Sequence, residues 1–176
     1  MNLSFKNFSI RIIGYLPYII FFYVIYTIEI LRELLLYNGL LQLVLFLIVA
    51  CIPAYLTKRM SYVDIAWPWG LVLIGALVLL LGDGYKPRIF LISGMYLFSG
   101  LRMGIGALIL FKKGHLDSEL SRYTYQRRRW EKAGYKNLDI SLQYEIMIQC
   151  FANITFLALP AILMAQNTAT SISVIE

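Results

Sequence analysis

The chain has 176 residues, of which 60% are hydrophobic and only 15% are Asp, Glu, Lys or Arg. Soluble domains are roughly 45 to 50% apolar and about 25% charged, so the composition excludes both an ordinary soluble domain and intrinsic disorder. The net charge of +6 does not indicate nucleic-acid binding, because the basic residues are interleaved with long apolar stretches. Cys51 and Cys150 lie in apolar runs and are expected to be buried. We therefore expect an all-α, polytopic integral membrane protein.

Five apolar runs approach the roughly 20 residues that a helix needs to cross about 30 Å of hydrocarbon. They cover residues 12–28, 40–56, 65–82, 89–111 and 146–165. We expect turns at Asn38-Gly39 and at 82–84, and the second of these makes the third and fourth spans a helical hairpin. The first run lacks a signal-peptide cleavage site, so we expect a retained anchor. No internal repeat or linker divides the chain, which predicts one membrane domain.

The positions of Lys and Arg predict the orientation, since cytoplasmic loops carry most of the basic residues. The amino-terminal segment, the loop before residue 65 and the segment 112–145 together hold 12 basic residues, and the other side holds 3. The amino terminus and the segment 112–145 are therefore predicted to be cytoplasmic.

Arg102 is the basic residue that falls inside a predicted span. A charge at this depth normally faces protein, a water-filled cavity or a partner, although its side chain can also extend to the interface. Gly100 and Gly104 form a G-x-x-x-G pair typical of close helix packing, and Arg102 points to roughly the opposite side, near Ser99. We expect Asp64, at the start of the third span, to pair with Arg102 at similar depth.

The residues around Asp64 allow two interpretations. Ser61 and Asp64 have the spacing of a capping box, and Trp67 and Trp69 would suit an aromatic belt at the membrane interface. Alternatively, Pro68 lies a turn inside the apolar run, where it frees a backbone carbonyl and kinks or breaks the helix. Helix breaks of this kind commonly line cavities.

The segment 112–145 contains the single histidine, His115, which without neighbouring His or Cys does not indicate a metal site. The sequence has no phosphate-binding glycine loop and no serine or cysteine nucleophile with a base. Its basic residues could hold the segment on anionic lipid headgroups. They could also bind a nucleotide phosphate, with Tyr123 or Trp130 available for stacking.

Several short motifs follow one another between about residues 62 and 160. They are VDIAWPWG at 63–70, Leu101-Arg102, an acidic stretch leading to Arg122-Tyr123, and Gln149 before Pro160. In order and spacing they resemble the amino-terminal half of a bacterial membrane family of unknown function that is grouped with the steroid 5-alpha-reductases. The acidic pair that normally precedes Arg-Tyr is replaced here by the looser Asp117-Ser-Glu119.

This resemblance implies a protein of the bacterial inner membrane that uses NADPH to reduce an activated carbon–carbon double bond in a lipid-like or steroid-like substrate. Such a reaction places negative charge on a carbonyl oxygen, which a preorganised donor must stabilise. The residues to which we assign these roles are Asp64, Arg102 and Tyr123 for catalysis, Arg122, Arg127 and Arg128 for the cofactor, and Trp67, Trp69 and Ser99 for the substrate pocket. Expected partners are membrane lipid and the substrate, without nucleic acid.

Related chains continue into further spans that carry much of the cofactor site, so we expect this chain to be truncated and inactive alone. Two alternatives remain. The first is a membrane methyltransferase that uses S-adenosylmethionine to modify lipid or prenylated substrates. The second is a non-enzymatic scaffold in which Gly100 and Gly104 form a helix interface, the basic segment binds lipid, and Arg102 tolerates lysine.

Overall fold

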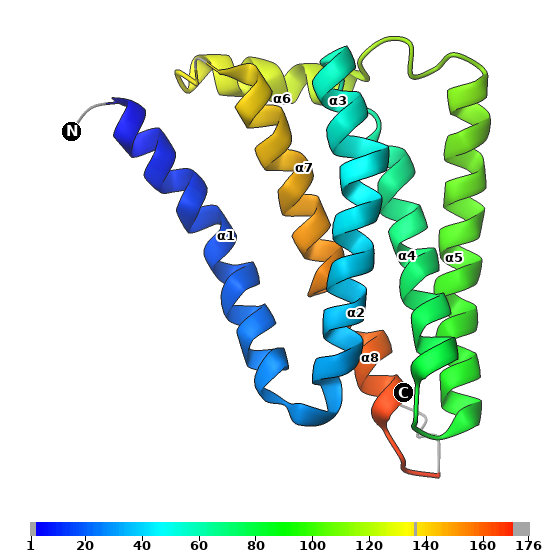
Figure 1. Ribbon diagram of the computed structural model, residues 1–176. Coiled ribbons are helices and arrows are strands. Elements are labelled where there is room, and N and C mark those ends of the chain that lie inside the picture. The colour runs from blue at the N-terminus through cyan, green and yellow to red at the C-terminus, as the bar shows by residue number, and fades with distance from the viewer. Residues whose placement is uncertain (1–2, 136, 171–176) are drawn as a thin grey trace.

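The computed structural model describes residues 3–135 and 137–170, and every regular element in that part is helical (Figure 1). The elements are α1 (Leu3–Thr27), α2 (Glu29–Phe46), the π-helical turn η1 (Leu47–Cys51), α3 (Ile52–Thr57), α4 (Val63–Leu81), α5 (Lys86–Lys112), α6 (Ser121–Lys132), α7 (Leu138–Ile154) and α8 (Leu159–Gln166). Five segments are long and apolar enough to cross a membrane: Ser9–Thr27, Glu29–Thr57, Val63–Leu81, Lys86–Lys112 and Leu138–Gln166. The expected all-α membrane protein with five spans is confirmed.

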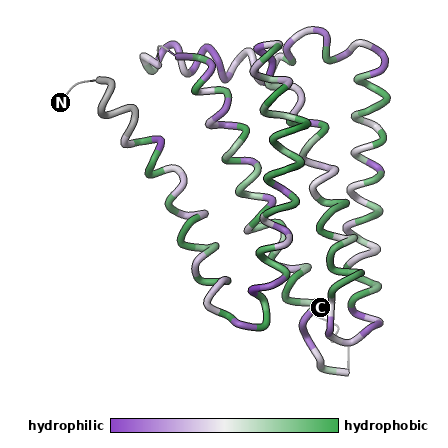
Figure 2. Tube along the Cα trace, in the orientation of Figure 1, coloured by the Kyte–Doolittle hydropathy of each residue, from purple (hydrophilic) through white to green (hydrophobic). Residues whose placement is uncertain are grey.

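The helices run between two opposite ends of the molecule. The start of α1, the end of α3, α6 and the start of α7 lie at one end, which we call the α6 end (Figure 1). The α1–α2 and α4–α5 turns lie at the opposite end. Hydrophilic residues gather along α6, whereas the spans are mostly apolar (Figure 2). The three groups of basic residues assigned to the cytoplasm thus share one end, and the assignment of that end to the cytoplasm stays a prediction.

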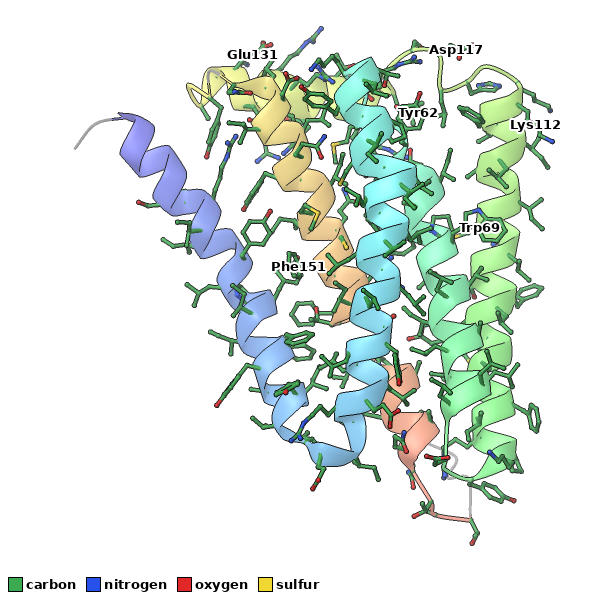
Figure 3. All side chains as sticks on the ribbon, in the orientation of Figure 1. Tyr62, Trp69, Lys112, Asp117, Glu131 and Phe151 are labelled. Carbon is green, nitrogen blue, oxygen red and sulfur yellow. The ribbon has the colours of Figure 1, made fainter. Side chains whose placement is uncertain are left out.

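Helices α4 and α5 form the expected hairpin through the short connection 82–85. Glycines on α5 allow the two helices to touch. A Cβ atom at Gly100 would lie 2.8 Å from the carbonyl oxygen of Pro68, and one at Gly104 would lie 3.0 Å from Trp69 Nε1. Trp69 points from α4 towards α5 (Figure 3). The G-x-x-x-G pair therefore packs against a helix of the same chain, and Pro68 is accommodated within a continuous α4.

Three carboxamides join α2, α4 and α7 inside the bundle, and we call Asn38, Gln42 and Asn153 the amide cluster. Gln42 Nε2 donates to the carbonyl oxygen of Gly70 (2.9 Å) and to Asn38 Oδ1 (3.2 Å). Asn153 Nδ2 donates to Gln42 Oε1 (3.3 Å) and to the carbonyl oxygen of Trp67 (3.4 Å). All three side chains are buried. These bonds satisfy polar groups that hydrocarbon cannot solvate.

The prediction of a turn at Asn38-Gly39 is wrong. Asn38 lies in the middle of α2 and is only 1% exposed, and the chain turns at Ile28 instead. The reason is a long-range partner, because Asn38 Nδ2 donates to the carbonyl oxygen of Ile154 (3.1 Å), where α7 ends. Glu29 therefore belongs to the first turn of α2, where a carboxylate interacts favourably with the helix dipole.

The fifth span also differs from the expected 146–165. Helix α7 begins at Leu138, where the side chain of Asn137 accepts a hydrogen bond from Ile140 N (3.0 Å), and it ends at Ile154. After an irregular stretch at 155–158, α8 continues with Pro160 in its first turn. The segment 112–145 consequently contains α6 and the first two turns of α7. Cys51 and Cys150 are buried and unpaired, as expected.

Candidate functional site

A pocket with a volume of about 400 Å³ opens between α4, α5, α6 and α7. It is lined by Asp64, Trp67, Pro68, Met103, Arg122, Tyr123 and Gln149. Four of the predicted site residues are therefore brought together, although they come from two segments almost 60 positions apart. Trp67 also packs against both apolar clusters of the bundle, so the wall that it forms is anchored in the core.

The carboxylate of Asp64 is shared by two neighbouring residues of α6. Tyr123 Oη donates to Asp64 Oδ1 (2.6 Å), and the guanidinium of Arg122 donates to Asp64 Oδ2. The Asp64 side chain is 25% exposed and that of Arg122 is 62% exposed. An ion pair this open to solvent contributes little stability. The triad is therefore better suited to orienting Tyr123 than to holding the fold together.

Burial raises the pKa of Tyr123, and the hydrogen bond to the Asp64 carboxylate raises it further. The same carboxylate raises the pKa of Arg122 through its hydrogen bond. Both groups therefore keep their protons at neutral pH. Tyr123 is a neutral phenol that can donate a hydrogen bond, and Arg122 stays cationic beside the Asp64 carboxylate.

Glu119 holds the start of α6 above the start of α4. Its Oε2 accepts from the backbone N–H of Met60 (2.9 Å) and from Arg127 Nη2 (3.0 Å), and its Oε1 accepts from Ser61 Oγ (2.7 Å). Tyr123 and Trp130, two turns apart on α6, are buried against the bundle. These contacts fix α6 across the end of the bundle, so that Arg122 and Tyr123 reach Asp64.

The capping box considered for Ser61 and Asp64 does not form. Helix α4 begins at Val63 without a side-chain cap, and Ser61 Oγ donates to Glu119 instead. The Asp64 carboxylate consequently remains available to α6.

The expected ion pair between Asp64 and Arg102 is wrong, because Asp64 binds Arg122 and Tyr123. Arg102 is exposed on α5 outside the pocket, and no hydrogen bond or ion pair joins it to another residue in the described ranges 3–135 and 137–170. Arg102 was chosen from the sequence because it lies at a membrane depth similar to that of Asp64. In the structure the cation that binds Asp64 is Arg122, because α6 lies across the end of α4.

The other predicted residues lie outside the pocket. Trp69 packs against Gly104 in the α4–α5 hairpin, and Ser99 is exposed on α5. Arg127 is engaged by Glu119 and by the carbonyl oxygen of Lys58, so its guanidinium serves the fold. Arg128 is exposed on α6. Of the three arginines assigned to the cofactor, Arg122 alone lines the pocket.

The sequence assignment missed two pocket residues, Gln149 and Met103. Gln149 lies one helical turn before Asn153 on α7, and no hydrogen bond to its side chain is found in the part of the chain that the structure describes. A carboxamide inside an apolar span was the available signal, because such groups need a partner in hydrocarbon. Met103 carries no comparable signal.

The model of one family, described as "Protein of unknown function (DUF1295)", matches residues 50–176. The chain belongs to this family. The matched part contains every residue that lines the pocket. No curated protein and no solved structure shows significant similarity to the chain. The expected membership in a family of unknown function is confirmed, whereas its grouping with the steroid 5-alpha-reductases stays a prediction.

Proposed function

We propose that this chain forms the substrate side of a membrane-embedded oxidoreductase that uses NADPH to reduce an activated carbon–carbon double bond in a lipid-like or steroid-like molecule. The resemblance of the motifs to steroid 5-alpha-reductases supports the reaction class. The observation that carries the proposal is the position of the Tyr123 phenol, which is held by Asp64 in the lining of a pocket between four helices.

The pocket combines a few polar groups with apolar walls. Its polar residues are Asp64, Arg122, Tyr123 and Gln149. Trp67, Pro68 and Met103 offer apolar surface from α4 and α5. Ligand sites of this kind use apolar contact for affinity and a few polar groups for orientation. A hydrophobic ketone would place its carbonyl oxygen at Tyr123 and its apolar body against these walls.

Reduction of a double bond conjugated to a carbonyl drives negative charge onto the carbonyl oxygen, and a fixed donor stabilises that charge. Tyr123 is such a donor because its raised pKa keeps the proton on the phenol. The hydroxyl has one hydrogen, so donating to the substrate means releasing Asp64. Arg122 continues to neutralise Asp64 at that moment, which makes the release less costly.

NADPH would supply the hydride, but the described residues do not fit its phosphates well. Arg122 is engaged by Asp64, Arg127 is engaged by Glu119 and Lys58, and Arg128 is exposed away from the pocket. Exposed arginine alone attracts phosphate weakly and in a salt-sensitive way. We therefore expect weak, salt-sensitive NADPH binding by these 176 residues and assign them the substrate side of the reaction.

The ultraviolet absorption of a bound hydrophobic α,β-unsaturated ketone, for example 4-cholesten-3-one, tests this proposal. Hydrogen bonding to the carbonyl shifts the enone band to longer wavelength, so binding to the wild-type chain in detergent should produce a red shift. Tyr123→Phe should remove the shift, because the donor is lost. Tyr125→Phe, an exposed position on the same helix, should keep it.

An unshifted band with the wild-type chain would reject the proposal, as would a shift that survives Tyr123→Phe. Titration with S-adenosylmethionine under the same conditions separates the methyltransferase alternative. If the chain binds S-adenosylmethionine more tightly than NADPH, the result would also count against a reductase.

A further inference from the structure

One face of α5 meets no other part of the described chain. Met95, Ser99, Arg102 and Gly106 share this face, which we call the Arg102 face, at intervals of four, three and four residues. Met95 is 58% exposed, and a Cβ atom at Gly106 would find no other atom within 4 Å. Alternation of three and four residues is the spacing with which one helix contacts another.

Arg102 lies deep in the span. Helix α5 has 27 residues and is about 40 Å long, so it exceeds a hydrocarbon core of about 30 Å by only about 5 Å at each end. Arg102 lies ten positions before Lys112, which places it about 15 Å from the end of the helix and about 10 Å inside the core. A guanidinium at this depth needs a counter-charge or a path to water.

The direction of the side chain disfavours such a path. Cα–Cβ bonds in a helix tilt towards its amino terminus, and α5 begins at the end opposite α6. Arg102 is therefore directed away from the nearer membrane surface and towards the more distant one. Among the described residues no carboxylate pairs with it, since the side-chain ion pairs found there join other residues.

We propose that the Arg102 face binds a membrane-spanning helix of a partner protein that carries an Asp or Glu at the depth of Arg102. The charge of Arg102 selects the carboxylate. Ser99 and Gly106, one turn to either side, leave room for the partner backbone to approach. This interaction is independent of the reaction proposed for the pocket, which Arg102 does not line.

The test uses the full chain in phosphatidylcholine vesicles at pH 7.4, with association measured by energy transfer to designed polyleucine transmembrane peptides. One peptide carries a single Asp about 10 Å inside the hydrocarbon core, a second carries Leu at that position, and a third carries the Asp about two turns away. The first peptide should bind at least ten times more tightly than the other two. Arg102→Leu should remove the preference.

Two glycine variants separate the face from general effects on α5. Gly106→Leu should weaken binding of the Asp peptide several-fold by blocking close approach. Gly94→Leu should leave it unchanged, because a Cβ atom at Gly94 would also meet no other atom within 4 Å but Gly94 lies about 120° around the helix from Gly106. Equal binding of the Asp and Leu peptides would overturn the proposal. A preference for the Asp peptide that persists in Arg102→Leu would also overturn it. The same holds if the chain forms a dimer that depends on Arg102 and excludes the peptide.

Discussion

The amide cluster and the pocket lined by Asp64 both place polar side chains inside an apolar bundle. They differ in whether these side chains have hydrogen-bond partners in the protein. In the amide cluster, Gln42 and Asn38 form hydrogen bonds with each other and with backbone carbonyl groups. Asn153 Oδ1 is the single side-chain nitrogen or oxygen atom of the cluster that lacks a hydrogen-bond partner within the described residues. In the pocket, the carboxamide of Gln149 has no hydrogen-bond partner among the residues that the structure describes, so it can bind a ligand. The comparison teaches that hydrogen-bond satisfaction separates polar groups that join helices from those that can receive a ligand.

The two regions are nevertheless connected through α4 and α7. The carbonyl oxygen of Trp67 accepts from Asn153, while Trp67 also lines the pocket. Gln149 and Asn153 lie one turn apart on α7. The amide cluster therefore fixes the spacing of the two helices that form the inner wall of the pocket.

The largest effect is expected from filling the space that the amide cluster occupies. A Cβ atom at Gly70 would lie 2.6 Å from Gln42 Oε1 and would also collide with Asn153 Nδ2. Gly70→Val should destabilise the protein by about 3 kcal/mol, since it adds overpacking to broken hydrogen bonds. Thermal unfolding in detergent measures this loss. Gly94→Val, at an open position on α5, is the control and should change little.

A direct comparison of two α7 positions should give the next largest effect. Asn153→Leu leaves Gln42 Oε1 without a donor and removes the additional donor of the Trp67 carbonyl oxygen, and it should cost about 2 kcal/mol. Gln149→Leu breaks no hydrogen bond that the structure shows and should change stability by no more than about 0.5 kcal/mol while weakening enone binding. Equal losses of stability at the two positions would refute the distinction between the regions.

Weakening the contacts of Glu119 should make α6, which contributes to the pocket, less firmly held and should leave the amide cluster unaffected. Glu119→Gln removes the negative charge that three donors share and should cost about 1 kcal/mol. Because α6 is then held less firmly, trypsin should cleave after Arg122 and Arg127 several times faster. Glu131→Gln, an exposed position of α6, is the matched control. Unchanged cleavage in Glu119→Gln would show that Tyr123 and Trp130 hold α6 without Glu119.

The smallest effect concerns pH. The pKa of Tyr123 is raised in the folded state, so the protonated phenol contributes stability that is fully present below the usual tyrosine pKa of about 10. This contribution is lost as the pH rises further towards the folded-state pKa. The difference in unfolding free energy between the wild type and Tyr123→Phe should therefore stay constant from about pH 7 to 9 and shrink above about 10. A difference that shrinks below pH 9 would contradict the assigned shift.

The sequence predicted the features that depend on local composition. Five spans and the α4–α5 hairpin follow from hydropathy and turn residues, and Asp64, Trp67, Arg122 and Tyr123 were recognised from short motifs. The roles of these residues are still predictions. Their juxtaposition in one pocket could be expected only from the resemblance, since no local pattern links residue 64 with residue 123.

The errors arose where a distant partner outweighs a local preference. Asn38-Gly39 has the composition of a turn, but Asn38 is held in α2 by the free carbonyl groups at the end of α7. Likewise, Arg102 matched Asp64 in depth, but α6 brings Arg122 to the same carboxylate. In both cases the deciding contact joins residues at least 58 positions apart, which hydrophobic periodicity does not report.

The distance in sequence between Asp64 and Arg122 also has a consequence for biosynthesis. The two residues are 58 positions apart, so a ribosome that adds about 5 to 20 residues per second needs about 3 to 12 s to deliver the arginine after the aspartate. During that interval the carboxylate stands in the first turn of α4, at the edge of the bundle, where water and lipid headgroups can solvate it. The α4–α5 hairpin can therefore enter the membrane before its counter-ion has been translated.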